Sequence, residues 1–172
     1  LLEQNRVAFG MHHMWPGNSL KVAAKVALVA DKWAHVAITY DGNSRAEGLR
    51  IYVNGKQQPV EFIRDGLYKD ITYEGGEPNL ALGYRFRDNG FKGGTVDELR
   101  IYDSALSSLQ VISLYSPEEA LLVWNKAFAQ CSEAEKGLIK EHYAFTSYGL
   151  LNGTKQTLRA HWKELNSIVN PI

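Results

Sequence analysis

The sequence has little cysteine: Cys131 is the single thiol among 172 residues, so no disulfide can form within the chain. No C-x-x-C pair and no C-x-x-C-H segment occurs, which excludes a thioredoxin-type redox motif and covalent attachment of a c-type haem. We interpret Cys131 as a buried, unreactive thiol in a helix, because a free cysteine behaves as a small apolar side chain.

An excess of charge of one sign is also lacking, since 19 Lys and Arg balance 19 Asp and Glu. A nucleic-acid binder needs a basic face, so we expect no nucleic-acid partner. No apolar run approaches the ~18 residues of a membrane-spanning helix, so we expect no membrane span. The chain begins "LLEQNRVAF" without a Met, and we interpret it as part of a longer protein in which a missing targeting signal excludes little.

The usual arrangements of catalytic residues are missing too. There is no H-x-H or H-x-x-x-H, and the neighbours His12 and His13 would point to opposite sides of a strand. A retaining glycosidase needs two carboxylates about 5–5.5 Å apart, which on a strand means positions i and i+2. No expected strand carries such a pair, and the sequence therefore predicts that the protein is not an enzyme.

The first part of the chain, to about residue 103, has the pattern of a β protein. Short apolar runs rich in Val, Ile and Tyr alternate with Gly, Asn and Asp, which predicts about seven strands. In "LRIYV" the apolar residues Leu49, Ile51 and Val53 share one face, as in a strand with one buried side. Asn54-Gly55 follows, the strongest signal for a two-residue hairpin turn, and we expect a type I′ turn that pairs residues 49–53 antiparallel with residues 56–60. This pattern predicts an antiparallel sandwich or barrel.

After residue 106 the pattern becomes helical. "SSLQVISLY" predicts a short helix, and two longer ones begin at Ser116 and Ser132, with Glu119 and Glu135 closing capping boxes. "LNGT" predicts a break, and a last helix follows from about Thr154. We expect about three amphipathic helices after residue 115, packed on each other and also on the β part or on a segment missing from this chain. Two apolar stripes would make these contacts: Leu121, Trp124 and Phe128, and Leu158, Trp162 and Leu165.

Three ordered motifs carry a family resemblance: "WAHVAITYDG" from residue 33, "GLRIYVNGK" from residue 48 and "GGTVDELRIYDSALS" from residue 93. They resemble the second half of a laminin-G-like, concanavalin A-like jelly roll. The resemblance implies a mainly β, antiparallel jelly-roll sandwich with a short closing helix over residues 1–115, followed by a helical segment over residues 116–172. Such jelly rolls extend further at the N-terminal side, so we expect this sandwich to lack strands.

A second resemblance covers nearly the whole chain. "HMWPGNSLKV", "YRFRDNGFKGG" and the closing "SIVNPI" are similar to a stretch of large exported cytochrome-c-type proteins of planctomycetes. This resemblance implies export to the periplasm or the cell exterior, and neighbouring domains of the parent polypeptide as partners. It implies no haem in this part.

Asp97 is out of place on the expected strand "TVDELRIYD", because it shares the face of Leu99 and Ile101. It could be a catalytic acid or metal ligand, but the adjacent Glu98 would face the other way. We favour a buried hydrogen-bond acceptor, since a buried carboxylate must be hydrogen-bonded. The indole of Trp33 and backbone N–H groups of the glycine-rich approach are candidate donors. Structural roles are therefore expected for Trp33, Asn54, Gly55 and Asp97.

Candidate binding residues fall in two places. His13 and Trp15 share a face with Met11 if the strand runs that far, and aromatic faces beside polar groups suit a sugar. The expected loop "GYRFRDNG" adds polar and aromatic side chains: Tyr84, Arg85, Arg87, Asp88 and Asn89. The alternative is that these are core aromatics and a solvated loop.

No cofactor is expected, with calcium left open as an alternative. Relatives of this fold often bind calcium between loops, and the candidates here are Asp41, Asn43 and Ser44, and Asp88 with Asn89. Each cluster offers a single carboxylate, whereas calcium takes six to eight oxygens. The competing interpretation is an Asx turn, in which the side chain bonds its own backbone.

Two functional hypotheses follow. The first is a non-catalytic laminin-G-like module that binds a glycan or glycoconjugate. The second is a structural spacer that packs against neighbouring domains and binds no small ligand. An exposed aromatic shelf beside polar groups would favour the first hypothesis, and bare apolar faces would favour the second.

Overall fold

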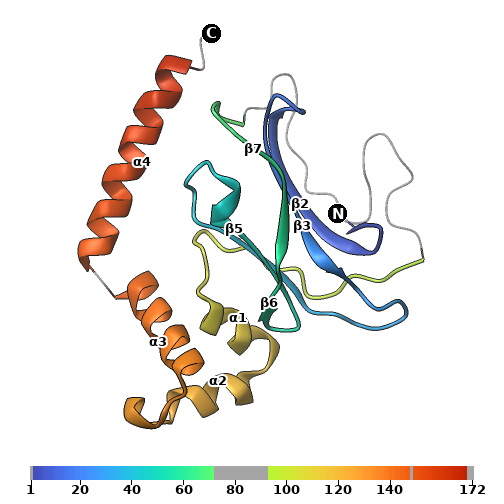
Figure 1. Cartoon of the computed structure of the whole chain (residues 1–172), viewed down its shortest axis with the longest axis vertical. Coiled ribbons are helices and arrows are strands. Elements are labelled where there is room, and N and C mark those ends of the chain that lie inside the picture. The colour runs from blue at the N-terminus through green and yellow to red at the C-terminus, as the bar shows by residue number, and fades with distance from the viewer. Residues whose placement is uncertain (1, 72–92, 148, 170–172) are drawn as a thin grey trace. The chain divides into compact units, whose positions relative to one another are not determined.

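The computed structural model describes residues 2–71, 93–147 and 149–169 (Figure 1). It divides into two compact units. One unit contains residues 1–71 and 104–172, and the other contains residues 72–103, of which 93–103 are described. Seven strands and four α-helices are assigned in the described residues, all of them in the first unit.

The first sheet has four antiparallel strands in the order β1-β2-β3-β7. Their bounds are Leu2–Glu3, Arg6–Met14, Asn18–Ala27 and Val60–Gly66. Two of them, β2 and β3, flank the turn "WPG" and pair with Gly10 opposite Lys21. Six residues between Asn18 and Ala24 are buried, because β3 lies between two neighbours and its apolar side chains enter the core.

The second sheet has the order β4-β5-β6, with bounds Val36–Tyr40, Leu49–Val53 and Lys56–Gln57. The turn between β5 and β6 has positive φ at both central residues, 50° at Asn54 and 73° at Gly55. Two positive φ values are the mark of a type I′ turn, so the hairpin prediction is confirmed. The Asn54 side chain also accepts a hydrogen bond from the backbone N–H of His35 at 2.9 Å, which ties the turn to the start of β4.

The hairpin is shorter than predicted. Pairing with β5 was expected through Val60, but it stops after Gln57 opposite Tyr52. The chain then crosses at Pro59 to the other sheet, where Val60 is opposite Ala24. Proline has no N–H to continue the ladder, which explains the change of sheet.

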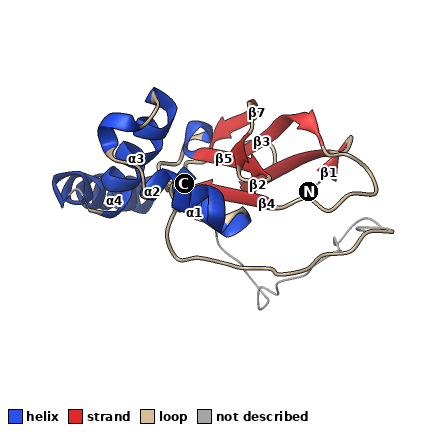
Figure 2. Cartoon of the chain, turned by 90° about the horizontal axis from the view of Figure 1, so that it is seen from below, coloured by secondary structure: helices blue, strands red, loops and turns tan. Residues whose placement is uncertain are grey.

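The two sheets share one apolar core. Val7, Leu20 and Val22 enter it from the first sheet, and Leu49 and Ile51 from β5. The alternation predicted for "LRIYV" is therefore confirmed at Leu49 and Ile51. The strands of both sheets lie together in Figure 2, as expected for a sandwich. The mainly β expectation is confirmed only in part, because the four α-helices contain more of the described residues than the strands.

The helices are α1 (Ser108–Tyr115), α2 (Pro117–Trp124), α3 (Glu133–Thr146) and α4 (Gly149–Val169). The predicted capping box is present at α3, where Ser132 and Glu135 bond reciprocally. It is absent at α2, because the Ser116 side chain makes no capping bond. The predicted break at "LNGT" is wrong, since α4 runs through it and one glycine only weakens a helix.

The helices contact each other, and polar bonds from Arg50 to Glu141 and between Tyr52 and Ser108 join α3 and α1 to β5. Leu109, Ala120 and Val123 form a small core shared by α1 and α2. However, the two stripes are not buried as expected: half or nearly half of each side chain is exposed at Leu121, Trp124, Phe128, Leu158 and Leu165. The contacts that hold these helices therefore bury only part of their apolar faces. Cys131 is buried as expected, but it follows the short turn Phe128–Gln130 and is not in an α-helix.

Residues 93–103 correct the prediction made for Asp97. No strand is assigned there, Asp97 is exposed, and its carboxylate accepts a hydrogen bond from the backbone N–H of Glu98 at 2.8 Å. Asp97 is therefore not a buried acceptor. A strand needs a hydrogen-bonding neighbour, and none of the described strands pairs with this segment. Trp33 is also not a buried donor, because its side chain is 71% exposed in the loop before β4.

Candidate functional site

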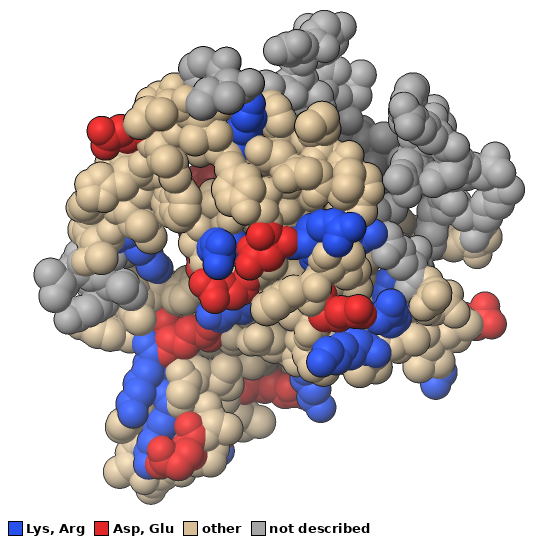
Figure 3. All heavy atoms as spheres, turned by 45° about the horizontal axis from the view of Figure 1, so that its top comes forward, with Lys and Arg blue, Asp and Glu red and all other residues tan. Residues whose placement is uncertain are grey.

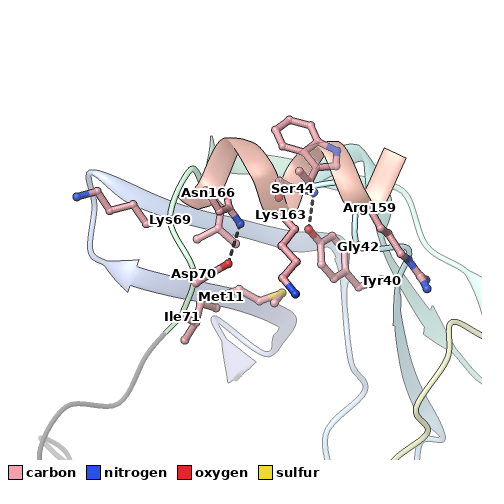
Figure 4. A pocket seen from close by; sticks show the side chains of 12 residues that line it. Met11, Tyr40, Gly42, Ser44, Lys69, Asp70, Ile71, Arg159, Lys163 and Asn166 are labelled. Atoms are coloured by element: carbon pink, nitrogen blue, oxygen red, sulfur yellow. Dashed lines mark hydrogen bonds between the residues drawn. The ribbon is translucent and has the colours of Figure 1, made fainter. Parts of the chain in front are cut away.

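A cavity of about 340 Å³ lies between α4 and the strands of the first unit (Figure 4). Its lining comes from β2, from the end of β4 and the loop after it, from the segment that follows β7, and from one face of α4. The lining residues are Met11, Tyr40, Gly42, Ser44, Leu67, Lys69, Asp70, Ile71, Arg159, Trp162, Lys163 and Asn166.

Tyr40 gives the cavity an aromatic ring with a fixed hydroxyl. Its phenol oxygen accepts a hydrogen bond from the backbone N–H of Ser44 at 2.7 Å, which holds the ring at the end of β4. Burial raises the pKa of Tyr40, and the nearby carboxylates of Asp41 and Asp65 add to the effect. The hydroxyl therefore stays protonated at neutral pH and can donate to a bound oxygen.

Polar contacts join α4 to the segment after β7. The Asn166 amide donates to the Asp70 carboxylate at 2.7 Å, as Figure 4 shows. The His13 ring nitrogen Nδ1 lies 2.6 Å from the Asp70 carbonyl oxygen. His13, one of the predicted ligand residues, thus contacts Asp70, which lines this cavity.

Three cations surround the cavity, and they point in different directions. In Figure 4 Lys163 extends from α4 across the cavity toward Met11 and Tyr40. Arg159 descends from the same helix, whereas the amine of Lys69 points away. Lys163 is therefore the cation best placed to meet a bound group.

Strand β2 ends at Met14, so the condition for Trp15 to share the face of His13 is not met. The Trp15 ring lies 5.1 Å from the His12 ring, and the charged groups of Lys21 and Arg64 are each 5.3 Å from it. The register of β2 shifts between His12 and Met14, so simple alternation fails at the end of the strand. Trp15 is about half exposed.

The predicted loop residues Tyr84, Arg85, Arg87, Asp88 and Asn89 lie outside the described residues. On the molecular face in Figure 3, basic and acidic side chains are interspersed. No described helix is long and apolar enough to cross a membrane.

The candidate calcium loop uses its side-chain oxygens on its own backbone. Asp41 accepts a hydrogen bond from the N–H of Asn43 at 3.0 Å, and Asn43 accepts one from Arg45 at 2.8 Å. These are Asx-type contacts, and they favour the structural interpretation of the loop. A Cβ on Gly48 would lie 2.3 Å from Asp41 Oδ1, so the loop closes over this glycine.

Ser107 and His142 form a pair that the sequence analysis missed, with the Ser107 hydroxyl 2.9 Å from His142 Nδ1. Ser107 is fully buried, and its hydroxyl also caps α1 by accepting from the N–H of Gln110. A buried cap has no access to a substrate, so the pair has a structural role.

The α4 residues of the cavity were also missed, although the sequence contains their signal. Arg159, Trp162, Lys163 and Asn166 recur at intervals of three and four, which places them on one helical face. The interpretation of Trp162 as part of an apolar stripe hid the polar residues beside it. Helical periodicity does not show which surface of the protein this helical face contacts.

A laminin G family model, described as the concanavalin A-like lectin/glucanases superfamily, matches residues 2–112. No curated protein matches. Among solved structures, an S-layer domain-containing protein (residues 221–444) from Clostridium thermocellum is similar, with 18% identity and a TM-score of 0.38. The alignment covers 67% of this chain and 65% of that one.

Proposed function

Because the chain belongs to the concanavalin A-like lectin/glucanases superfamily, we propose that it is a non-catalytic module that binds a saccharide in the cavity beside α4. The observation that supports this is the cavity itself. Its volume of about 340 Å³ falls in the range of small-molecule sites, and its lining mixes aromatic rings with a few polar groups.

The lining has the two features that a sugar requires. Sugar rings have apolar faces, which Met11, Tyr40 and Trp162 can contact. Sugar hydroxyls need donors and acceptors at the edge, and Asn166 and Asp70 supply both. The described residues offer no group of three His, Cys, Asp or Glu side chains that could hold a metal.

A glycan array on the whole chain tests the proposal, followed by titration of the best glycan. Asn166→Ala should weaken binding about five- to tenfold, since it removes one hydrogen-bonding group. Trp162→Phe should also weaken binding, because it keeps a ring and removes the N–H. Trp15→Ala is the matched control, as it removes an exposed aromatic ring outside the lining. The proposal fails if no glycan binds, or if binding depends on Trp15 and not on Asn166.

A structural spacer is the second candidate, and exposed apolar side chains favour it. Leu121, Leu122 and Trp124 on α2 are each about half exposed or more, and Trp33 is 71% exposed. Such residues are typical of surfaces that contact other domains. If this function is right, a longer form of the protein should protect the Trp124 indole from collisional quenching.

We also infer from the motif resemblance that the chain belongs to an exported protein of the planctomycete cytochrome-c type. The neighbouring domains of that parent would then be its partners. Sequencing of the surrounding gene and fractionation of the source cells test this inference. An intracellular parent without haem-attachment motifs would contradict it.

A further inference from the structure

We propose that the cavity selects an acidic saccharide, one that carries a carboxylate, and that Lys163 pairs with this group. The inference rests on the proposed function and adds the ligand class and the residue that determines it. It is carried by the charges around the cavity, by an unpartnered indole N–H, and by the position of α4 in the chain.

The first argument is that the cavity cations have no carboxylate partner. Elsewhere in the described residues six basic side chains are paired with acids: Arg6, Arg45, Arg50, Arg100, Lys126 and Lys136. Within the same described ranges, Lys69, Arg159 and Lys163 form no such pair. Figure 4 shows Lys163 extending across the cavity, where its amine would meet a bound group.

The acids nearby are already engaged by other groups. Asp70 accepts from Asn166 on the cavity rim, and Asp41 accepts from the backbone of its own loop. Asp65 accepts from the N–H of Ala46 at 2.8 Å and lies 3.9 Å from Arg45. The lining contains three basic residues and one carboxylate, Asp70, and Lys163 is the basic residue whose amine extends across the cavity, which favours an anionic ligand.

The second argument concerns Trp162. Its Nε1 atom is buried and has no hydrogen-bond partner in the part of the chain that the structure describes. Buried polar groups are nearly always hydrogen-bonded, so this donor lacks an acceptor. The atom is closed to solvent in this structure, so a carboxylate or hydroxyl oxygen of a bound sugar would reach it only after the indole turns toward the cavity.

The third argument is where these groups lie in the chain. Lys163, Trp162 and Arg159 belong to α4, outside residues 2–112 that match the family. Lys163 and Arg159 are four residues apart, so both can reach the same side of the helix. Preference for an acidic sugar would thus be a property that the C-terminal helix adds to the β sandwich.

The experiment compares trigalacturonate with neutral galactotriose by titration calorimetry on the whole chain at low salt. Trigalacturonate should bind at least about tenfold tighter, and added salt should reduce this preference because screening weakens charge pairing. Lys163→Gln should lower the affinity for trigalacturonate about tenfold and that for galactotriose much less, by about twofold at most. Lys163→Arg should restore most of the loss, since it restores the charge.

Lys140→Gln is the matched control, because Lys140 is an exposed lysine on α3 away from the lining, and it should change neither affinity. Equal binding of both sugars would overturn the inference and leave the proposed function standing. So would a loss of both affinities in Lys163→Gln, which would assign Lys163 a packing role. If neither sugar binds and the array is also negative, the proposed function itself fails.

Discussion

Replacing Glu141 by Gln should loosen the contact between the helices and the β sandwich. One carboxylate oxygen of Glu141 accepts a hydrogen bond from Arg50 on β5. The other accepts one from the backbone N–H of Ser108, in the first turn of α1, at 3.1 Å. Tyr52 adds a hydroxyl contact of 3.1 Å to the Ser108 side chain. A single carboxylate on α3 therefore joins three elements.

The magnitude follows from these two bonds. A hydrogen bond to a charged group contributes about 1.5–3 kcal/mol, and an acid near a helix N-terminus about 0.3–1 kcal/mol. The Glu141 and Arg50 side chains are 21% and 33% exposed, so solvent screens the pair and the lower values apply. Gln keeps the shape and one acceptor, and we expect Glu141→Gln to cost about 2 kcal/mol of unfolding free energy.

Urea unfolding followed by far-UV circular dichroism measures this cost. Lys140→Gln is the control, since it alters an exposed neighbour on the same helix and should stay within about 0.5 kcal/mol. A double-mutant cycle with Arg50→Gln should give a coupling energy of about 1 kcal/mol or more, as for contacting charges. The reasoning is refuted if Glu141→Gln is no more destabilising than the control, or if the two changes are additive.

Three further predictions concern local features. Hydrogen bonds, first from Lys126 and then from the helix cap, lower the pKa of Glu135 from 4.5 to about 2, so its stabilisation is present above pH 4.5 and lost as the pH falls toward 2. In Glu135→Gln the melting temperature should therefore fall less steeply than in the wild type as the pH decreases below 4.5. Gly55→Val should cost about 1–2 kcal/mol or more in urea unfolding, because the φ of 73° resists side chains, whereas Gly55→Asn should be milder. Asp41→Ala should destabilise by about 1 kcal/mol equally in EDTA and in calcium, and a calcium-dependent melting temperature in the wild type alone would instead support a metal site.

The features that the sequence predicted well are those set by a few neighbouring residues. Asn54 and Gly55 both tolerate positive φ, so the turn type follows from two positions. Ser132 and Glu135 cap a helix through bonds that span three residues. The alternation of Leu49 and Ile51 also emerges correctly, since a strand with one buried face has period two.

The predictions that failed depend on contacts between distant residues. The segment around Asp97 has the alternation of a strand, but alternation does not supply the neighbouring strand that its backbone requires. Trp33 was a candidate donor to Asp97 because its motif was expected to begin a strand, yet β4 begins three residues later at Val36. In both cases the apolar pattern of the local sequence was recognised correctly. The neighbouring element that would bury these side chains was only assumed.

The same distinction explains the candidate site. The calcium and sugar candidates came from β loops, where the family resemblance directed attention, and their local chemistry could be interpreted without the fold. The cavity instead depends on α4 meeting residues more than 90 positions earlier, as the bond between Asn166 and Asp70 shows. Helical periodicity placed Arg159 and Lys163 on one face, but a face becomes a binding surface only through the element opposite it. If the acidic-sugar preference is found, the ligand choice of this sandwich would reside in its helical extension, whose sequence lies outside the family match.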